Sequence, residues 1–333
     1  MALNKLTYIE SAHMDPYYNL AVEEYLLLHC EENECILYLW QNKNTVVIGR
    51  NQNAWKECLV SRLEEENGYL VRRLSGGGAV YHDTGNLNFT FLVRKSNYDL
   101  NKQLTVILKA VQKLGIPAEK SGRNDILADG RKFSGNAYYE QGDYCYHHGT
   151  LMLDVNVDDL SRYLTVSKEK LKSKGVDSVR ARVGNLKDFA PDLTVELMKE
   201  KLVEAFEEVY GLNAEQIKTE ELPQSEIEER TNRFASWDWI FGKKLDFQYE
   251  ISHRFPWGEV VLQIQVKDGK IQEVLASSDA MNQELIQWMN RGLQGVRYCK
   301  NAICEAFSLY PSKDKEEEQM VQDIITWIES EDL

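Results

Sequence analysis

The sequence lacks the features that mark membrane-spanning, secreted and zinc-binding proteins. No apolar run approaches the roughly 20 residues that a membrane helix needs, and residues 1–7 lack the apolar core of a signal peptide. Six cysteines in 333 residues do not form a disulfide framework, and the pairs Cys30/Cys35 and Cys299/Cys304 lack the tight spacing of a zinc knuckle. We therefore expect a cytoplasmic protein with reduced thiols and no membrane partner.

The chain is also short of positive charge. Its 39 Lys and Arg residues are outnumbered by 53 Asp and Glu residues, which gives a net charge of −14. This balance argues against general nucleic-acid binding, which is dominated by phosphate contacts. Residues 68–185 are the exception, with 18 basic and 12 acidic residues. Such a segment fits a locally bound anionic small molecule such as a nucleotide, although a solvated lysine-rich helix near 167–174 would explain part of the excess.

Three consecutive glycines lie between two apolar, strand-like runs. Residues 72–83 read RRLSGGGAVYHD. Each glycine in ordered structure costs about 0.5–1 kcal/mol relative to alanine, so three together predict bare backbone whose N–H groups approach an anionic ligand. Arg72 and Arg73 add donors suited to carboxylate or phosphate. A flexible hairpin turn is the alternative, and a Walker A loop is excluded because no Gly-Lys-Ser/Thr follows.

Two further stretches carry polar side chains on expected strands. Residues 121–139 read SGRNDILADGRKFSGNAYY, in which Asp129-Gly130 predicts a two-residue hairpin turn. Alternation along the following strand would place Lys132 and Ser134 on one face. That polar face is either a binding site or a solvated surface. Residues 146–153 read YHHGTLML and form another expected strand.

In this order, the three stretches resemble the lipoate–protein ligase A family. The family carries an RRxSGGGAV loop, then GRND, an RKxSG strand and HHGTL, and all are present here with compatible spacing. Residues 47–58 and 174–183 extend the match. It runs from about Tyr8 to Trp239 and continues more weakly to the C-terminus. The ordered set of motifs makes the resemblance specific.

The order of expected elements predicts an α/β fold, with an α+β mixed sheet flanked by helices. Asp15-Pro16 predicts the start of a helix, and amphipathic stripes mark helices near 100–114 and 195–209. Residues 36–40 and 45–49 are expected to form a hairpin. The resemblance implies the biotin/lipoate ligase catalytic fold, which is related to class II aminoacyl-tRNA synthetases.

A change of pattern near residues 241–244 predicts a second, smaller domain. Three strands and three helices are expected after it, with a turn at Asp268-Gly269 between the last two strands. We therefore expect a catalytic domain at 1–245, which binds lipoate and ATP, and a small α+β C-terminal domain at 246–333. The resemblance implies that the small domain reorients during the reaction.

The resemblance implies an ATP-dependent ligase with two half-reactions. Lipoate and ATP, with Mg²⁺, would give lipoyl-AMP and pyrophosphate. The lipoyl group would then pass to a lysine of an apo lipoyl-carrier domain, either an E2 subunit of a 2-oxoacid dehydrogenase or the H protein of glycine cleavage. A monomer is expected. The sequence leaves open which acyl substrate is preferred and which carrier is served.

The resemblance also assigns the site residue by residue. Lys132 would orient the carboxylate and the α-phosphate together, because one ammonium can donate to both. Further candidates are Asn86 and Asn124, with Asp125 as a magnesium ligand. The adenylate-binding residues would be Arg73, Gly78, Ala79, Val80, Tyr81, His82, Lys132, Ser178, Val179 and Arg180. The lipoate-binding residues would be Ser75, Gly76, Gly77, Gly78, Lys132, Ser134, His148 and Gly149.

Two other functions are compatible with parts of this pattern. An octanoyl or lipoyl carrier-protein transferase of the same fold would use a cysteine thioester, and Cys145 lies close to His147 and His148 in the sequence. A binding module that kept the lipoyl pocket is the other. The RKxSG strand and the match at 174–183 favour the ligase.

Overall fold

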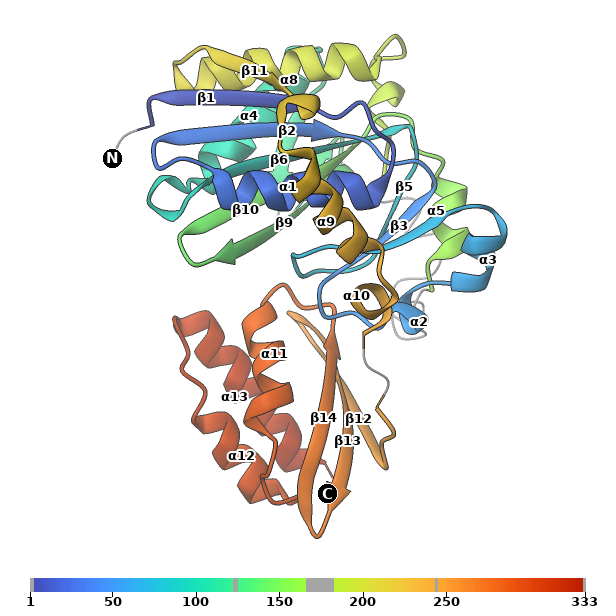
Figure 1. Ribbon diagram of the computed structural model, residues 1–333, viewed down its shortest axis with the longest axis vertical. Coiled ribbons are helices and arrows are strands. Elements are labelled where there is room, and N and C mark those ends of the chain that lie inside the picture. The colour runs from blue at the N-terminus through green and yellow to red at the C-terminus, as the bar shows by residue number, and fades with distance from the viewer. Residues whose placement is uncertain (1–2, 122–124, 166–182, 243–244, 332–333) are drawn as a thin grey trace. The chain divides into compact units, whose positions relative to one another are not determined.

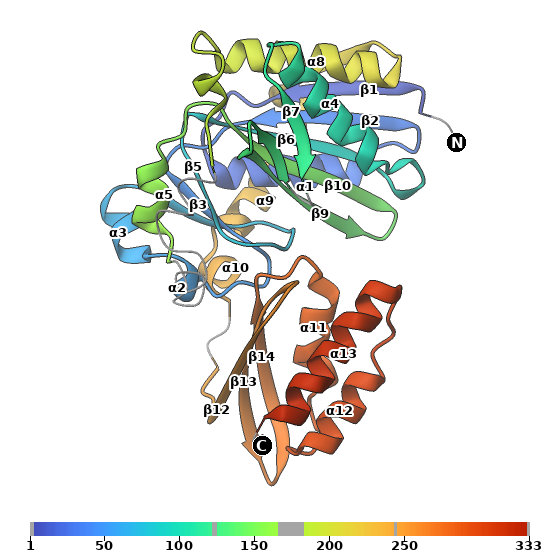
Figure 2. The same cartoon turned by 180° about the vertical axis from the view of Figure 1, so that it is seen from behind.

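The computed structural model describes residues 3–121, 125–165, 183–242 and 245–331. The chain forms two compact units (Figures 1 and 2). Unit 1 consists of Met1–Val47, Glu57–Arg73 and Val80–Ile240, and unit 2 of Ile48–Lys56, Leu74–Ala79 and Phe241–Leu333. The glycine-rich stretch therefore belongs to unit 2 by its contacts, although the strands on either side of it belong to unit 1.

Unit 1 is built on a mixed sheet. Within the described residues it has eight strands in the order β11-β1-β2-β6-β10-β9-β8-β7, of which β11, β1 and β2 run parallel and the others pair antiparallel. The predicted mixed sheet flanked by helices is confirmed. The strands are β1 (Lys5–Glu10), β2 (Glu34–Trp40), β6 (Asn86–Arg94), β7 (Ala118–Ser121), β8 (Asp125–Ala128), β9 (Arg131–Gln141), β10 (Tyr144–Met152) and β11 (Ala214–Lys218).

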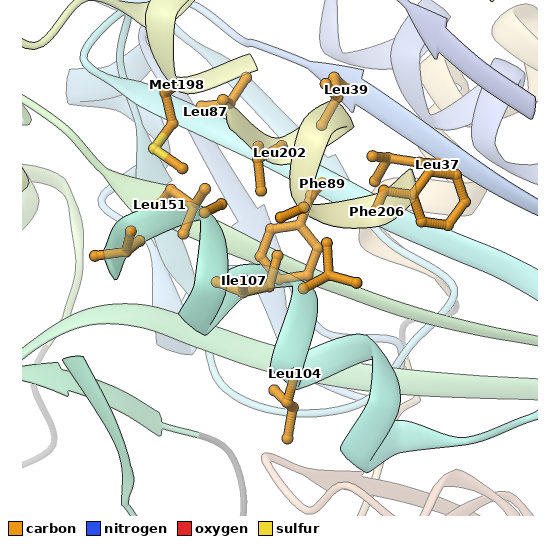
Figure 3. Close-up of a cluster of buried hydrophobic side chains, with 14 of the residues drawn as sticks. Leu37, Leu39, Leu87, Phe89, Leu104, Ile107, Leu151, Met198, Leu202 and Phe206 are labelled. Atoms are coloured by element: carbon orange, nitrogen blue, oxygen red, sulfur yellow. The ribbon is translucent and has the colours of Figure 1, made fainter. Parts of the chain in front are cut away.

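Helices cover both faces of this sheet (Figures 1 and 2). On one face, α4 (Leu100–Gln112) and α8 (Val195–Tyr210) lie side by side and bury their apolar stripes against the strands. Figure 3 shows this core, to which α4 contributes Leu104, α8 contributes Leu202 and β6 contributes Phe89. Both helices occur where amphipathic periodicity predicts them.

The helix α1 (Pro16–His29) lies on the opposite face, under α9 (Gln224–Ala235). Asp15 caps it, because its Oδ1 accepts from the backbone N–H groups of Tyr17 and Tyr18 at 2.8 and 3.3 Å. This start is where the sequence predicts it. Because the sheet covers one side and α9 the other, α1 is buried over most of its length.

A second, small sheet in unit 1 corrects one prediction. Its order is β4 (Tyr69–Arg72), β3 (Thr45–Ile48) and β5 (Val80–His82), whereas β2 belongs to the large sheet, so the hairpin expected from 36–40 and 45–49 is wrong. The physical reason is the buried connection. The Asn19 side chain of α1 donates to the Gln41 carbonyl at 2.8 Å and to Asn42 Oδ1 at 3.0 Å, so the two residues that follow β2 are bonded to α1.

Short elements complete unit 1. They are α3 (Val60–Glu65), α5 (Val157–Tyr163), α10 (Trp237–Phe241, except its last residue) and the 3-10 turns at Lys95–Asn97, Leu186–Asp188 and Thr219–Glu221. The short helix α2 (Ala54–Glu57) belongs to unit 2 except for its last residue.

Unit 2 contains a three-stranded antiparallel sheet with three helices packed on it. The strands β12 (Tyr249–Phe255), β13 (Gly258–Lys267) and β14 (Lys270–Ser278) share a core with α11 (Gln283–Gly292), α12 (Lys300–Ser308) and α13 (Lys315–Ser330). Asp268 and Gly269 form the predicted turn with φ values of 51° and 72°. The expected small α+β unit with a separate sheet is confirmed.

Two sequence features can be checked directly in the structure, the lack of a membrane-spanning helix and the state of the cysteines. In the described part of the chain, no helix combines the length and apolarity that crossing a membrane requires. All six cysteines are described and carry free thiols.

Candidate active site

Lys132 lies near the start of β9, directly after the hairpin turn. Asp129 and Gly130 have φ values of 48° and 72°, as the predicted two-residue turn requires. The turn returns the chain beside β8, where Lys132 Nζ lies 2.6 Å from Asp125 Oδ1. Both side chains are partly exposed. The hairpin therefore places the partly exposed ammonium of Lys132 beside the carboxylate of Asp125, which orients it.

A β-bulge modifies the expected alternation along this strand. Lys132 is opposite Leu127 while Ser134 is opposite Ile126, so Phe133 is the extra residue. The expectation that Lys132 and Ser134 simply share a face is therefore wrong. An added Cβ at Gly135 would lie 3.3 Å from the Cε and Nζ of Lys132, which places the ammonium over that glycine.

Ser134 is buried next to the bulge. Its Oγ has no hydrogen-bond partner among the residues that the structure describes. A buried hydroxyl without a partner costs about 1–3 kcal/mol, so it is a candidate ligand contact.

Arg73 and His82 form a second group of buried polar side chains. Arg73 Nη1 donates to the Val47 carbonyl at 3.2 Å, and burial lowers the pKa of its guanidinium to about 10, which still leaves it charged at neutral pH. Burial, with the nearby Arg73 charge, lowers the pKa of His82 to about 3. A neutral His82 and a cationic Arg73 both suit an anionic ligand.

The tautomer of His82 follows from its neighbour. Asn42 Nδ2 donates to His82 Nδ1 at 3.3 Å, so the proton of the ring is on Nε2. That Nε2–H is buried and has no acceptor within the described ranges. It is thus a second buried donor without a partner.

A buried carboxylate that sequence reasoning missed organises the neighbouring strands. Glu23 of α1 is 1% exposed, and its Oε1 accepts from His148 Nδ1 at 2.8 Å and from Thr90 Oγ1 at 2.7 Å. Thr90 in turn accepts from Trp40 Nε1 at 3.1 Å. The signal for Glu23 was weak, because one acidic residue in an apolar helix is easily assigned to the solvated face.

His148 and Gly149 lie on β10 at the point where it pairs with β9. An added Cβ at Gly149 would lie 2.6 Å from Phe89 Cζ and 2.8 Å from both Asn136 Oδ1 and the Gly135 carbonyl. The close approach of β6 and β9 therefore already requires this glycine. The neighbouring His147 bonds Asn136 through Nε2 at 2.8 Å, and burial, with His148 nearby, lowers its pKa to about 3.

Residues 76–78, which lie in unit 2, differ in whether the fold requires glycine at each position. An added Cβ at Gly76 would lie 2.7 Å from the carbonyl oxygens of Ala280 and Met281, and Gly77 has a φ of 89°. Gly78 has neither constraint from the described residues, because none of them lies within 4 Å of its added Cβ. Packing and turn geometry explain two of the three glycines, and Gly78 is the one that the fold does not require.

The remaining predicted residues are distributed over both units. Ser75 accepts from the Arg50 N–H at 2.8 Å in unit 2, and Ala79 ends the same stretch. In unit 1, Val80 and Tyr81 form β5 with His82, and Asn86 Nδ2 donates to Asn88 Oδ1 at 3.0 Å. Four predicted residues lie outside the described residues: Asn124, Ser178, Val179 and Arg180.

The side chains that could bind Mg²⁺ are few in the described part of the structure. Throughout the described ranges, no group of three or more His, Cys, Asp or Glu side chains could hold a metal ion. Asp125 offers one carboxylate, and one of its oxygens already contacts Lys132. This fits Mg²⁺ held mainly by substrate phosphates, which is how that ion commonly binds, and it does not fit a preformed protein cage.

Cys145 does not have the environment of a nucleophile. It packs in the core of unit 1, and burial raises the pKa of its thiol to about 11. The reactive thiolate is therefore scarce at neutral pH.

Comparison with known proteins identifies the family. The family model "Lipoyl protein ligase A/B catalytic domain" matches residues 15–207, and "Bacterial lipoate protein ligase C-terminus" matches residues 244–328. A curated lipoate-protein ligase A from Psychrobacter cryohalolentis is 40% identical over 332 residues, 97% of this chain and 98% of that protein. The chain belongs to the lipoate–protein ligase A family. It is thus an enzyme of the ligase class that acts in lipoylation.

Solved structures of lipoate–protein ligases share the fold. LipL1 of P. falciparum in complex with lipoate superposes with a TM-score of 0.86 at 28% identity, over 98% of this chain and all (100%) of that one. A bipartite ligase from Thermoplasma acidophilum, studied with its E2 lipoyl domain, has a TM-score of 0.65 at 25% identity and covers 74% of this chain and 100% of its own. A lipoate-protein ligase A bound with ATP, at 23% identity and a TM-score of 0.63 over 72% of this chain and 99% of that one, shows the shared fold.

A glycine substitution separates the structural from the ligand-binding interpretation. Gly78→Ala should leave the melting temperature unchanged, because the new methyl group meets none of the described residues. Lipoylation activity should fall at least about tenfold if a ligand approaches this backbone. The matched control is Gly149→Ala, which should lower stability by about 1–3 kcal/mol through overpacking. A Gly78→Ala enzyme with full activity would favour the flexible-turn interpretation.

Acid should destabilise the protein through its buried histidines. The folded pKa of His82 and His147 is about 3, whereas their ordinary value is 6.5. Between these values the unfolded chain binds protons that the folded chain excludes, so stability is complete above about pH 6.5 and is lost as the pH falls. Each histidine should cost about 2 kcal/mol at pH 5 relative to pH 7.

Denaturant titration at pH 7 and pH 5 measures this loss. In His147→Gln, the difference between the two pH values should shrink by about 2 kcal/mol relative to wild type. An unchanged difference would mean that His147 does not resist protonation in the folded chain.

Proposed function

We propose that this enzyme activates lipoate with ATP to form lipoyl-AMP and pyrophosphate, and then transfers the lipoyl group to a lysine of an apo carrier domain. In the first step a carboxylate oxygen of lipoate bonds to the α-phosphorus and the bond to pyrophosphate breaks. In the second, the lysine nitrogen bonds to the acyl carbon, AMP leaves, and the nitrogen loses its proton. Family membership supports the lipoate substrate, and a protein of this fold that was solved with ATP supports the nucleotide.

The observation that carries the proposal is the pair of buried donors without partners. His82 Nε2–H and Ser134 Oγ lie on two of the predicted ligand-binding motifs, and neither has a partner in the described part of the chain. Proteins rarely leave such groups unpaired unless a ligand satisfies them. We assign His82, with the Arg73 cation, to the adenylate and Ser134 to the lipoyl end.

Lys132 is the residue that we assign to the chemistry. The first step brings two anions together, so it needs a cation that contacts both. The ammonium of Lys132 is partly exposed, has three donors and is oriented by Asp125. It would hold the carboxylate beside the phosphate and stabilise the charge that develops there. Mg²⁺, when bound, would neutralise the phosphate oxygens beside Asp125.

Several finer assignments follow from the resemblance and remain proposals. The acceptors are apo lipoyl domains of E2 subunits and the H protein, and the archaeal relative studied with its E2 lipoyl domain supports the first. The predicted adenylate contacts of the glycine-rich stretch, Ser178, Val179 and Arg180 also stay predictions. So do the domain boundary at 245/246, the cytoplasmic location and the monomeric state.

Replacing the lysine tests the proposed function. Lys132→Ala should slow lipoate-dependent pyrophosphate release by roughly 100- to 1,000-fold, because one preorganised donor to a developing charge typically contributes about 3–4 kcal/mol. The melting temperature should not change, because the side chain is partly exposed. Lys95→Ala, which breaks the exposed ion pair with Glu140 of β9, is the matched control. Near wild-type release in Lys132→Ala would refute the assignment.

Replacing the cysteine tests the thioester alternative. Cys145→Ala should retain ligase activity within a few-fold, because an adenylate is already an activated acyl donor and the thiol is buried. Intact mass of the wild-type enzyme after reaction with lipoate and ATP provides the second readout. An acyl-cysteine adduct in wild type, together with an inactive Cys145→Ala variant, would establish the transferase instead.

A further inference from the structure

The start of β9 leaves the regular pairing of the large sheet. β9 pairs with β10 only as far as Asn136, which is opposite Gly149. One residue earlier, the Gly135 N–H donates to the Thr150 side-chain oxygen at 3.2 Å instead of to a main-chain carbonyl. Lys132 therefore has β8 on one side, and among the described residues no strand of the large sheet pairs with it on the other (β9 and β10 are labelled in Figures 1 and 2).

A segment from much later in the chain takes this place. We call residues 183–189 the clasp. Val183 forms a parallel bridge with Lys132, and the Gly184 N–H donates to the Lys132 carbonyl at 3.0 Å. The main chain of Lys132 is thus held from both sides, by β8 and by the clasp, although it lies beyond the last residue of β9 that pairs with β10.

The clasp is fixed at its other end to the chain that leaves β10. The Lys187 N–H donates to the Leu153 carbonyl at 3.1 Å. The Asn185 side chain both accepts from and donates to the main chain of Val155, at 3.0 Å in each direction. The clasp therefore spans the opening between β9 and β10.

Arg131, the residue before Lys132, joins the clasp to β9 through its side chain. Its Nη1 lies 2.7 Å from Asp188 Oδ2, and its guanidinium carbon lies 5.0 Å from the centroid of the Phe189 ring. The clasp passes so close that a Cβ at Gly184 would lie 3.1 Å from Arg131 Cβ. The Arg131 side chain is therefore enclosed by three residues of the clasp: Gly184, Asp188 and Phe189.

This contact is poorly placed to stabilise the fold. The Arg131 and Asp188 side chains are 36% and 44% exposed, and exposed ion pairs of this kind contribute about 0–1 kcal/mol. Its position is more informative than its strength. The residue that it holds is the immediate neighbour of Lys132, whose ammonium ends a flexible four-carbon chain and depends on a fixed main chain for its position.

We propose that Arg131 and Asp188 are positioning residues for Lys132, and that they act by holding the clasp on the main chain of the lysine. Asp125 orients the ammonium, and the clasp fixes the backbone from which it projects. The proposal rests on the function proposed for Lys132 in lipoate activation. Neither Arg131 nor Asp188 contacts the substrate in this account.

Asp188→Asn tests the proposal, because it removes the charge pair and keeps the size of the side chain. Lipoate-dependent pyrophosphate release should lose about tenfold in kcat, since misplacing a reacting group by a fraction of an ångström costs on that order. The KM values for lipoate and ATP should stay within about twofold, and the melting temperature within about 2 °C. A purely structural ion pair would not separate kcat from KM in this way.

Two further variants complete the experiment. Exchanging the charges, with Arg131→Asp and Asp188→Arg together, should recover at least half of the lost kcat. The matched control is Glu140→Gln, which breaks the exposed Lys95–Glu140 pair at the opposite end of β9 and should leave kcat unchanged.

The failures of the two proposals are distinguishable. Wild-type enzyme that releases no pyrophosphate with lipoate and ATP would refute the proposed function. An active wild type with an equally active Asp188→Asn variant would refute the positioning role alone. A loss of kcat in Asp188→Asn that the charge exchange does not recover, or that Glu140→Gln reproduces, would also overturn it.

Discussion

The structure of unit 1 depends on one buried carboxylate. Glu23 lies on a helix that is covered on both sides, so its charge must be compensated locally. It receives hydrogen bonds from His148 on β10 and Thr90 on β6, and the Arg73 cation lies within its field. One acidic residue thereby fixes the orientation of a helix and two strands around the residues that the family resemblance assigns to the ligands. Removing it would take the acceptor away from the Thr90 hydroxyl and from His148 Nδ1, which costs more than the bonds themselves contribute.

Local signals in the sequence predicted the local structure well. Asp129-Gly130 and Asp268-Gly269 form the expected turns because their backbone dihedrals are set by the two residues themselves. Asp15 starts α1 because its carboxylate satisfies N–H groups only two and three residues away. The hairpin predicted for 36–40 and 45–49 is wrong, because the bonds from Asn19 to residues 41 and 42 are long-range. No pattern within a short window encodes such contacts.

In the candidate site, too, local motifs are predictable from the sequence and long-range contacts are not. The motifs predict Lys132, Ser134, His82 and His148 as site residues, but they do not predict what surrounds them. The bulge at Phe133 breaks the two-residue period on which the predicted polar face rested. Glu23 and Asp188 lie 125 and 57 residues from their partners His148 and Arg131, so only the folded chain brings these pairs together. Gly76, Gly77 and Gly78 show most clearly what a motif cannot predict. They are identical in sequence, but Gly76 packs against carbonyl oxygens, Gly77 has a left-handed backbone and Gly78 has no described neighbour at its added Cβ.

The central claim is that this enzyme consumes ATP to attach lipoate to a lysine of a carrier domain. The intact mass of an apo lipoyl domain, incubated with the enzyme, lipoate, Mg²⁺ and ATP, tests it most directly. The account predicts a gain of one lipoyl group, which disappears when ATP is left out or when the acceptor lysine is replaced by arginine. An equal gain without ATP, or transfer only from an acyl thioester donor, would contradict it.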